Sequence, residues 1–277
     1  MNYLERLISA SEKFNSIICM GLDPVLEDIP VEGEPGDAIY IFYETILDKM
    51  VQTGTLPGAV KPNYAFYAQY GLEGIDALQR IIRLYKNEGL PVILDVKRGD
   101  IGKTAAAYAR EAFDFFGADA VTLSPYLGYD SVSPFISGYP DRGYYILTRT
   151  SNKSASDFQD LGTGTGTLFM RVAEKILEWY HPGIGSVVGA TYPEELSRVS
   201  SLFTSSGKDV PLLIPGIGAQ GGDLDETLRI LDTFPDRRIH RINSSSGINY
   251  AYKKLGNLNY ADAAVTALKE LNSATGN

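Results

Sequence analysis

Short runs rich in valine and isoleucine recur eight times along this chain of 277 residues, and a polar turn follows each of them. Most of these turns lead into a segment of helical periodicity. Because strands that are apolar throughout must be buried on both faces, the pattern predicts a parallel sheet covered by helices. Eight such units favour a closed barrel over an open, doubly wound sheet. We therefore predict an α/β fold, a single (β/α)8 TIM barrel that spans residues 1–277.

Eight strands and seven helices are expected, and no linker, charge block or low-complexity tract divides them into separate domains. The expected strands are residues 17–22, 58–62, 92–96, 120–123, 144–148, 186–190, 212–215 and 239–243. The expected helices are residues 39–50, 75–86, 104–115, 168–179, 193–203, 224–231 and 261–271.

Charge and cysteine content narrow the class of ligand. The chain carries a formal net charge of −9 and a pI near 4.8. This balance argues against nucleic acid as a partner, because phosphate neutralisation needs a concentrated basic face. An anionic ligand must therefore meet a local positive site. Cys19 is the only cysteine, so neither an intrachain disulfide nor a cysteine zinc cluster is expected.

The histidines and the N-terminus exclude further classes. His181 and His240 lie far apart in sequence with no carboxylate–histidine pattern. The chain therefore lacks most of the residues that a histidine metal site or a serine triad requires. We expect His181 at the end of a helix and His240 in a strand. Four charged residues interrupt any continuous apolar run in residues 1–14, which argues against a secretory signal and a membrane span there. We expect a cytoplasmic protein with no membrane partner.

Polar residues stand where the predicted strands end. Active sites of (β/α)8 barrels gather at the carboxyl ends of the strands, so these residues fall on the expected catalytic rim. They are Asp23 at the end of the first strand, Lys61 at the end of the second, Asp95 and Lys97 at the end of the third, Gln220 after the seventh, and Ser244, Ser245 and Ser246 after the eighth.

The densest charge lies in the stretch LDVKRGD, residues 94–100. Residues two apart on a strand point to the same side, so Asp95 and Lys97 should both face the barrel mouth. Lys61 comes from the neighbouring strand and Asp100 begins the next loop, which gives a cluster of two acids and two bases. Such a cluster is either a structural ion-pair network or a catalytic one. Its position at strand ends favours catalysis, because burying unpaired charge is costly.

The arrangement of these charges indicates a type of chemistry. A lysine nucleophile must lose its proton, whereas flanking carboxylates stabilise the ammonium form. Lys97 is therefore better suited to donate a proton than to attack a carbonyl. An ammonium held beside Asp95 suits a reaction in which negative charge develops on carbon and is then protonated. Cofactor-free decarboxylation matches this description.

Glycine-rich stretches are candidate anion sites. LIPGIGAQGGD, residues 213–223, ends a strand and enters a helix, so backbone N–H groups and the Gln220 amide could hold a phosphate. A plain glycine-rich turn is the alternative. GDIGKT, residues 99–104, lacks the glycine that a P-loop requires five residues before its second glycine. LGTGTGTL, residues 161–168, does not follow a strand directly, and we expect a mobile loop over the site.

These motifs together resemble those of a known family. LDVKRGDIGKT, residues 94–104, is similar to the D-x-K-x-x-D-I signature of orotidine 5'-phosphate decarboxylases in their longer bacterial form. The resemblance implies a barrel dimer that converts orotidine 5'-phosphate to UMP and carbon dioxide, the last step of pyrimidine synthesis, without metal or cofactor. Further landmarks extend over nearly the whole chain and are GLDP (21–24), VKPNYAFY (60–67), LTRTSN (147–152) and PGIGAQGGD (215–223).

The resemblance also implies roles for individual residues. Lys97 would protonate C6, Asp95 would lie by the departing carboxylate, and Lys61 would orient the charged network and the ribose. Asp100 would reach into the site of the partner subunit, together with Ile101 and Thr104. The implied substrate-binding positions are Asp23 for a ribose hydroxyl, Ser151 for the pyrimidine ring, Gln220 for the phosphate, and Pro215, Ser245 and Ser246.

One position departs from the family. Where the family usually has an arginine on the phosphate, as in N-S-S-R-G, this chain has NSSSG with Ser246 at that place. Backbone N–H groups of the turn can still bind phosphate, but a bidentate charge-assisted contact is missing. Arg98, Arg149 or Arg241 could take its place.

Two alternative functions also remain beside the decarboxylase: a Mg-dependent phosphosugar decarboxylase or aldolase of the same barrel superfamily, and a non-catalytic nucleotide-binding relative.

Overall fold

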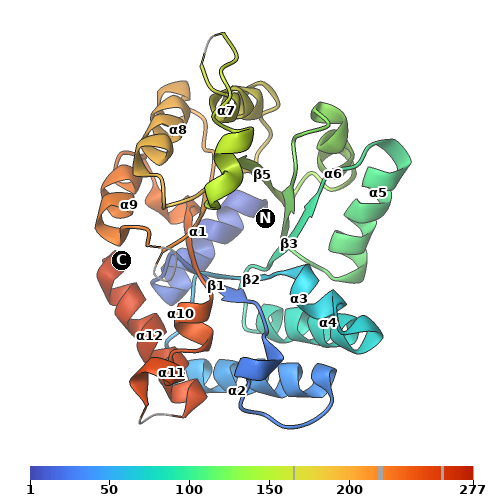
Figure 1. Cartoon of the computed structure of the whole chain (residues 1–277), viewed down its shortest axis with the longest axis vertical. Coiled ribbons are helices and arrows are strands. Elements are labelled where there is room, and N and C mark those ends of the chain that lie inside the picture. The colour runs from blue at the N-terminus through green and yellow to red at the C-terminus, as the bar shows by residue number, and fades with distance from the viewer. Residues whose placement is uncertain (165, 218–220, 257–258, 277) are drawn as a thin grey trace.

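Eight parallel strands form a ring in the computed structural model, which describes residues 1–164, 166–217, 221–256 and 259–276 (Figure 1). Their order is β2-β1-β8-β7-β6-β5-β4-β3, and bridges from Val60 to Val92 and from Asn63 to Asp95 link β2 to β3. The predicted eight-stranded parallel barrel is therefore confirmed. The strands are β1 (Ile18–Leu22), β2 (Ala59–Pro62), β3 (Ile93–Arg98), β4 (Ala120–Leu123), β5 (Gly143–Arg149), β6 (Ile184–Val188), β7 (Leu212–Pro215) and β8 (Arg241–Ser244).

Helices surround the ring of strands (Figure 1). Within the described part of the chain, none of them combines the length and the apolar character that a bilayer crossing requires. The helices are α1 (Tyr3–Phe14), α2 (Pro35–Thr53), α3 (Tyr64–Ala68), α4 (Gly71–Asn87), α5 (Gly102–Arg110), α6 (Ser133–Gly138), α7 (Leu168–Glu178), α8 (Pro193–Ser206), α9 (Leu224–Leu231), α10 (Ser246–Asn249), α11 (Tyr252–Leu255) and α12 (Tyr260–Thr275). A π-helical turn, Glu111–Phe115, continues α5, and short 3-10 turns are Leu26–Asp28, Tyr129–Ser131, Lys153–Asp157 and Arg237–Ile239.

Several expected bounds differ from the observed ones. The expected helix 104–115 is α-helical only to Arg110 and then widens into the π turn. The sixth strand begins and ends two residues earlier than predicted. His240 was expected in a strand, which is wrong, because it lies just before β8 and its Nδ1 accepts the Leu212 N–H at 3.0 Å in place of a backbone carbonyl. Burial and the neighbouring Arg241 lower the pKa of His240 to about 3, so the ring is neutral and can accept this bond.

The amino-terminal end of the barrel is closed by α1, which lies behind the ring of strands in Figure 1. The Tyr3 hydroxyl donates to the Tyr145 hydroxyl inside the barrel at 3.1 Å. Arg241 is fully buried, and its guanidinium donates to the carbonyl oxygens of Leu7 at 2.6 Å and Gly58 at 3.2 Å. Because this end is sealed, the carboxyl ends of the strands are left as the open end of the barrel.

Candidate active site

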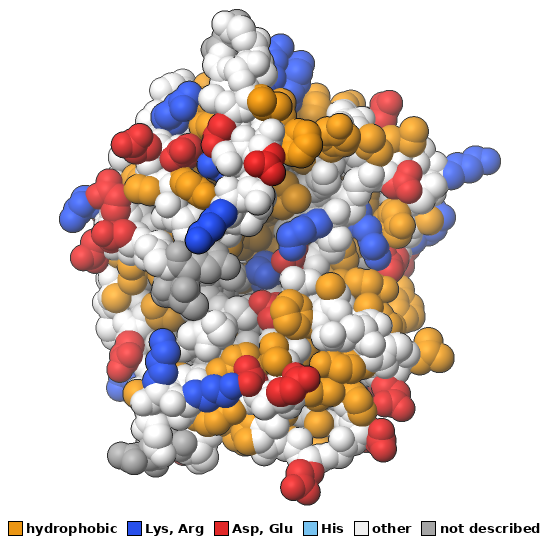
Figure 2. Space-filling view, in the orientation of Figure 1, with side chains coloured by type: hydrophobic (Ala, Val, Ile, Leu, Met, Phe, Trp, Pro, Cys, Tyr) orange, Lys and Arg blue, Asp and Glu red, His pale blue; other side chains and the backbone are white. Residues whose placement is uncertain are grey.

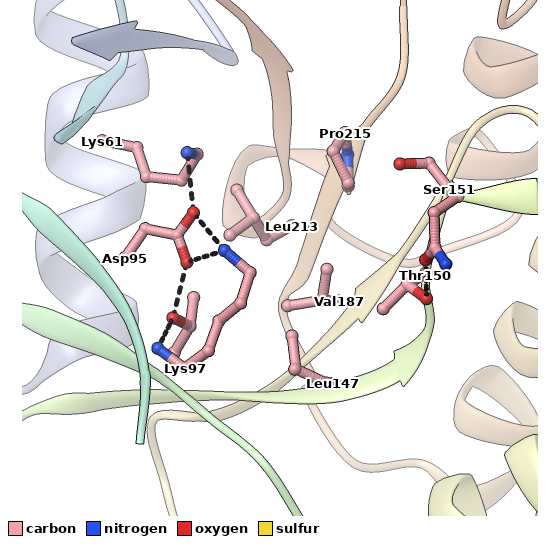
Figure 3. Close-up of a pocket in the computed structure, with 11 residues that line it drawn as sticks. Lys61, Asp95, Lys97, Leu147, Thr150, Ser151, Val187, Leu213 and Pro215 are labelled. Atoms are coloured by element: carbon pink, nitrogen blue, oxygen red, sulfur yellow. Dashed lines mark hydrogen bonds and ion pairs between the residues drawn. The ribbon is translucent and has the colours of Figure 1, made fainter. Parts of the chain in front are cut away.

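A cavity of about 320 Å³ opens at the carboxyl ends of the strands. Charged side chains of β2 and β3 form one wall, and the segment that follows β5 forms the opposite wall (Figure 3). Apolar side chains lie between the two walls, so a flat ligand could fit with one charged and one neutral polar edge. The lining residues are Lys61, Asp95, Lys97, Thr122, Leu147, Thr150, Ser151, Asn152, Val187, Leu213 and Pro215. Figure 2 shows lysine and arginine side chains around the hollow at the mouth, although the chain as a whole is acidic.

The Asp95 carboxylate is the centre of the charged wall. Lys97 Nζ lies 2.7 Å from Oδ1 and 2.8 Å from Oδ2, and Lys61 Nζ lies 3.2 Å from Oδ2. The Thr122 hydroxyl donates to Oδ1 at 2.7 Å. The side chains of Lys61 and Asp95 are only 7% and 8% exposed, whereas that of Lys97 is 48% exposed. The structure therefore brings together three of the four charged residues expected in this cluster.

The electrostatics of this wall keep Asp95 and Lys61 charged at neutral pH. Burial alone would raise the pKa of Asp95, but the ammonium groups of Lys61 and Lys97 outweigh it and hold that pKa well below its usual range. Burial would lower the pKa of Lys61, yet Asp95 and Asp23 raise it above its ordinary value. The arrangement is thus one carboxylate shared between two ammonium groups.

The backbone at Lys97 does not follow the regular strand from which we predicted its orientation. Its φ is +47°, in the left-handed region that costs a residue with a side chain roughly 1–2 kcal/mol. The β3–β4 pairing is irregular between Leu94 and Arg98. Asp95 and Lys97 do meet at the mouth as predicted, but through this left-handed turn and not through simple alternation along a strand. Strain of this kind concentrates at functional sites.

The neutral wall is a short polar segment that follows β5, and Ser151 points from it toward the cavity (Figure 3). The Gln159 side chain braces this segment: its Oε1 accepts the Thr150 N–H at 2.9 Å, and its Nε2 donates to the Thr150 hydroxyl at 2.8 Å. A Cβ at Gly189 would lie 2.9 Å from the Ser151 Cβ, so the end of β6 packs directly on Ser151. The position of Ser151 is therefore fixed from two sides.

A third group of predicted residues lies where β1 and β8 end. A Cβ at Gly21 would lie 2.6 Å from the Ser245 Cβ and 3.1 Å from Asp23 Oδ2, so Asp23 and Ser245 are neighbours. Asp23 Oδ1 is buried and has no hydrogen-bond partner among the described residues. Ser246 is exposed and begins α10. The expected ribose and phosphate positions thus share one corner of the rim.

Other predicted site residues lie outside the cavity of this single chain. Ile101 and Thr104 are exposed at the start of α5, and the Asp100 carboxylate accepts the Ile101 N–H at 2.8 Å. Asp100 has no ion pair with Lys61 or Lys97 among the contacts of the described residues, so the expected four-residue cluster has three members here. Gln220 lies outside the described residues.

The three arginines considered as replacements at Ser246 are engaged elsewhere. Arg241 is sealed at the opposite end of the barrel, which excludes it. Arg149 pairs with Asp160 at 3.1 Å and stacks on Tyr192. Arg98 donates to both oxygens of Glu111, at 2.8 and 3.0 Å.

Sequence reasoning missed several lining residues. Thr122 is a polar residue in the otherwise apolar strand AVTL, and this exception is the signal that could have identified it. Leu147, Val187 and Leu213 carry no such signal, because apolar residues in strands are expected in any barrel core. In the described ranges, no three histidine, cysteine, aspartate or glutamate side chains are grouped closely enough to hold a metal ion.

Comparison with known proteins gives consistent matches. Residues 16–256 match the model of the "Orotidine 5'-phosphate decarboxylase / HUMPS family". Orotidine 5'-phosphate decarboxylase of Ralstonia nicotianae is 44% identical over 270 residues, which cover 95% of this chain and 94% of that protein. The protein of the same name from Dechloromonas aromatica is 45% identical over 259 residues, covering 91% of this chain and 92% of the relative.

Solved structures give the same picture. OMP decarboxylase of Leishmania donovani superposes with a TM-score of 0.80 at 34% identity and covers 99% of both chains. UMP synthase of the same organism superposes with a TM-score of 0.80 at 35% identity. That match covers 99% of this chain, which spans 56% of the length of the synthase.

The ion pairs of Asp95 predict a pH-dependent loss of stability in Asp95→Asn. The variant leaves the Lys61 ammonium buried without its carboxylate, so the free energy of unfolding at pH 7 should fall by about 3–5 kcal/mol. Because the folded-state pKa of Asp95 is depressed, its contribution is present above the unfolded-state pKa of about 3.9 and is lost as the pH falls. The difference from the wild type should therefore shrink below about pH 4.

Urea denaturation at pH 7 and below about pH 4 measures the difference in unfolding free energy between Asp95→Asn and the wild type. Asp37→Asn is the control, since it removes an exposed pair with Arg80 and should change the unfolding free energy by less than about 0.5 kcal/mol. Equal stability of Asp95→Asn and the wild type at pH 7 would contradict the prediction.

Proposed function

The chain belongs to the orotidine 5'-phosphate decarboxylase / HUMPS family, and from this premise we propose that it converts orotidine 5'-phosphate to UMP and carbon dioxide. The reaction would need neither metal nor cofactor and would complete UMP synthesis in the cytoplasm. The observation that carries the proposal is the Asp95 carboxylate held between two ammonium groups on one wall of the cavity.

The charged wall suits the two steps of the reaction. When the bond from C6 to the carboxylate breaks, its electron pair stays on C6 and carbon dioxide leaves. The Lys97 ammonium then gives its proton to C6. At about 4 Å and an effective dielectric constant near 20, one charge pair is worth roughly 4 kcal/mol, so fixed charges can stabilise a carbanion substantially. Asp95 would lie beside the departing carboxylate, and Lys61 would orient both Asp95 and the ribose.

The rest of the substrate would extend across the cavity. The pyrimidine would lie on the apolar side chains, with Ser151 at its polar edge opposite Lys97. Asp23 would bind a ribose hydroxyl through its unpaired Oδ1. Ser245, Ser246 and the backbone N–H groups that open α10 would face the phosphate, with Pro215 and Gln220 on the other side of it. The positive rim of the mouth supports an anionic ligand (Figure 2).

The proposal includes a homodimer. Asp100, Ile101 and Thr104 would enter the cavity of the partner subunit, and Ile101 is 49% exposed in the single chain. Phe115 and Leu127 are also large apolar side chains that are about half exposed. Figure 2 shows apolar side chains gathered on the side of the molecule formed by α4, α5 and α6. This surface is the one we assign to the subunit contact.

The proposed reaction predicts turnover in the presence of a chelator. Purified protein with orotidine 5'-phosphate and excess EDTA should lose the ultraviolet absorbance of the substrate as UMP forms. The second candidate is a Mg-dependent phosphosugar decarboxylase or aldolase, because the matched family model also includes HUMPS proteins. Such an enzyme would lose activity in EDTA, because metal-bound enediolate chemistry does not survive chelation. Tight binding of UMP without turnover would instead identify a non-catalytic nucleotide-binding protein.

The assigned proton donor predicts the behaviour of Lys97→Ala. Removal of the ammonium should lower kcat by about 10⁴-fold, at the upper end of what a general acid contributes, while affinity for UMP changes little. Stopped assays and calorimetry with UMP measure the two quantities. Lys269→Ala removes an exposed lysine on α12 and is the matched control. Residual kcat within tenfold of the wild type would remove Lys97 from its role.

The serine at position 246 predicts weaker binding of the substrate phosphate than an arginine there would give. Ser246→Arg should raise kcat/KM for orotidine 5'-phosphate about 10–100-fold, because a charge-assisted bond to phosphate contributes roughly 1.5–3 kcal/mol. Ser246→Gln has comparable length without charge and should give little of this gain. If Ser246→Arg leaves kcat/KM unchanged or lower, another contact already supplies the phosphate charge.

A further inference from the structure

Lys97 has a backbone conformation that its own residue type does not explain. In the described part of the chain, only Asn15 and Lys97 have positive φ without being glycine, at +48° and +47°. Asn15 caps the carboxyl end of α1, where asparagine is well tolerated. Lys97 lies inside β3 and has no such local reason, so contacts from outside β3 must hold it.

The Thr122 hydroxyl supplies the first of these contacts. The β3–β4 register pairs Leu94 with Val121 and Arg98 with Leu123, so four steps along β3 match two along β4. The surplus leaves the N–H groups of Val96 and Lys97 without partners in the ladder. Both donate to Thr122 Oγ1, at 3.1 and 2.9 Å. One oxygen thus satisfies both N–H groups of the bulge.

The same hydroxyl is also bonded to the charged wall. It donates its single proton to Asp95 Oδ1 at 2.7 Å, while Lys97 Nζ lies 2.7 Å from that same oxygen. The Thr122 side chain therefore fixes the backbone and the ionic partner of Lys97 at once. A valine at this position has the same shape and makes none of these three bonds.

The residue after Lys97 is held as well, so the turn is closed on both sides. The Arg98 guanidinium is bonded to Glu111 and packs over the rings of Tyr64 and Tyr108, at 5.0 and 4.2 Å from their centroids. The Arg98 carbonyl accepts the Ser124 N–H at 2.7 Å. With Arg98 fixed, the Thr122 hydroxyl decides which way the Lys97 side chain leaves the backbone.

We propose that Thr122 is a positioning residue whose hydroxyl holds the left-handed turn at Lys97 and so keeps the ammonium against Asp95 at the cavity. This inference rests on the proposed function for its kinetic consequence and on geometry for the rest. Thr122 neither gives nor takes a proton in the reaction.

Thr122→Val tests the proposal. It should lower kcat about 100-fold, the effect of a displacement near 1 Å at a reacting group, while KM and affinity for UMP stay near wild type. Thr122→Ser keeps the hydroxyl and should restore kcat to within a few-fold of wild type. Thr122→Cys offers only a weak acceptor and should fall between them, and this order remains measurable if the valine variant does not fold.

Thr148→Val is the matched control. Thr148 is a buried threonine of β5 whose hydroxyl lies 2.6 Å from that of Ser186, so its loss should lower Tm without lowering kcat. A kcat in Thr122→Val within threefold of wild type would overturn the proposal, and so would equal kcat values for the serine and cysteine variants.

A crystal structure of Thr122→Val, or of Thr122→Cys if the valine variant does not fold, separates this inference from the proposed function. We expect residue 97 to leave the left-handed region and its Nζ to move beyond 4 Å from Asp95, the limit for an ion pair. An unchanged turn would overturn the inference even if the wild type decarboxylated nothing. Absence of turnover in the wild type would overturn only the proposed function.

Discussion

The buried carboxylate of Asp95 constrains the open end of this barrel more than any other group. Its side chain is 8% exposed, and an ion removed from water costs several kcal/mol unless partners replace the solvent. Two ammonium groups and one hydroxyl do so here, and they come from β2, β3 and β4. These three strands must therefore bring their polar residues to one height, which sets the irregular register of β3 against β4.

The two ends of the barrel solve the burial of charge in different ways. At the closed end, the Arg241 guanidinium is surrounded by backbone carbonyl oxygens, and Asp119 is shared among Lys86, Arg142 and Arg6. Every one of these groups has its partners within the protein, so this end contributes stability. At the open end, Asp23 Oδ1 has no partner among the described residues, and the Lys97 side chain, which lines the cavity, is 48% exposed. Unsatisfied polar groups beside a cavity are where a ligand gains binding energy.

The fold could be predicted from sequence because eight short and mostly apolar runs alternate with segments of helical periodicity, which is the pattern of a parallel sheet covered by helices. The contact of Asp95 with Lys97 was also predicted, but from a regular strand conformation that the backbone at Lys97 does not adopt. At the left-handed turn, the Lys97 N–H donates to the hydroxyl of Thr122, which is 25 residues away in sequence. A local sequence pattern does not reveal such a contact. The predicted helix 104–115 is likewise α-helical only to Arg110, and Glu111, which begins the π turn, bonds Arg98 across 13 residues. The assignments of Asp100, Ile101 and Thr104 to a partner subunit stay predictions.

The two lysines on Asp95 are not equivalent in exposure, and this difference supports the proposal that Lys97 is the acid. Lys61 is 7% exposed, and the carboxylates of Asp95 and Asp23 raise its pKa against the opposing effect of burial, so it holds its proton and has little contact with solvent. Lys97 is 48% exposed, so in the proposed reaction its ammonium would reach the ligand and regain a proton from solvent after each turnover. A proton donor must do both, whereas a fixed charge that keeps Asp95 ionised must do neither. The left-handed turn at Lys97 fits this division, because it lets a half-exposed side chain fold back onto a buried carboxylate from the solvent side.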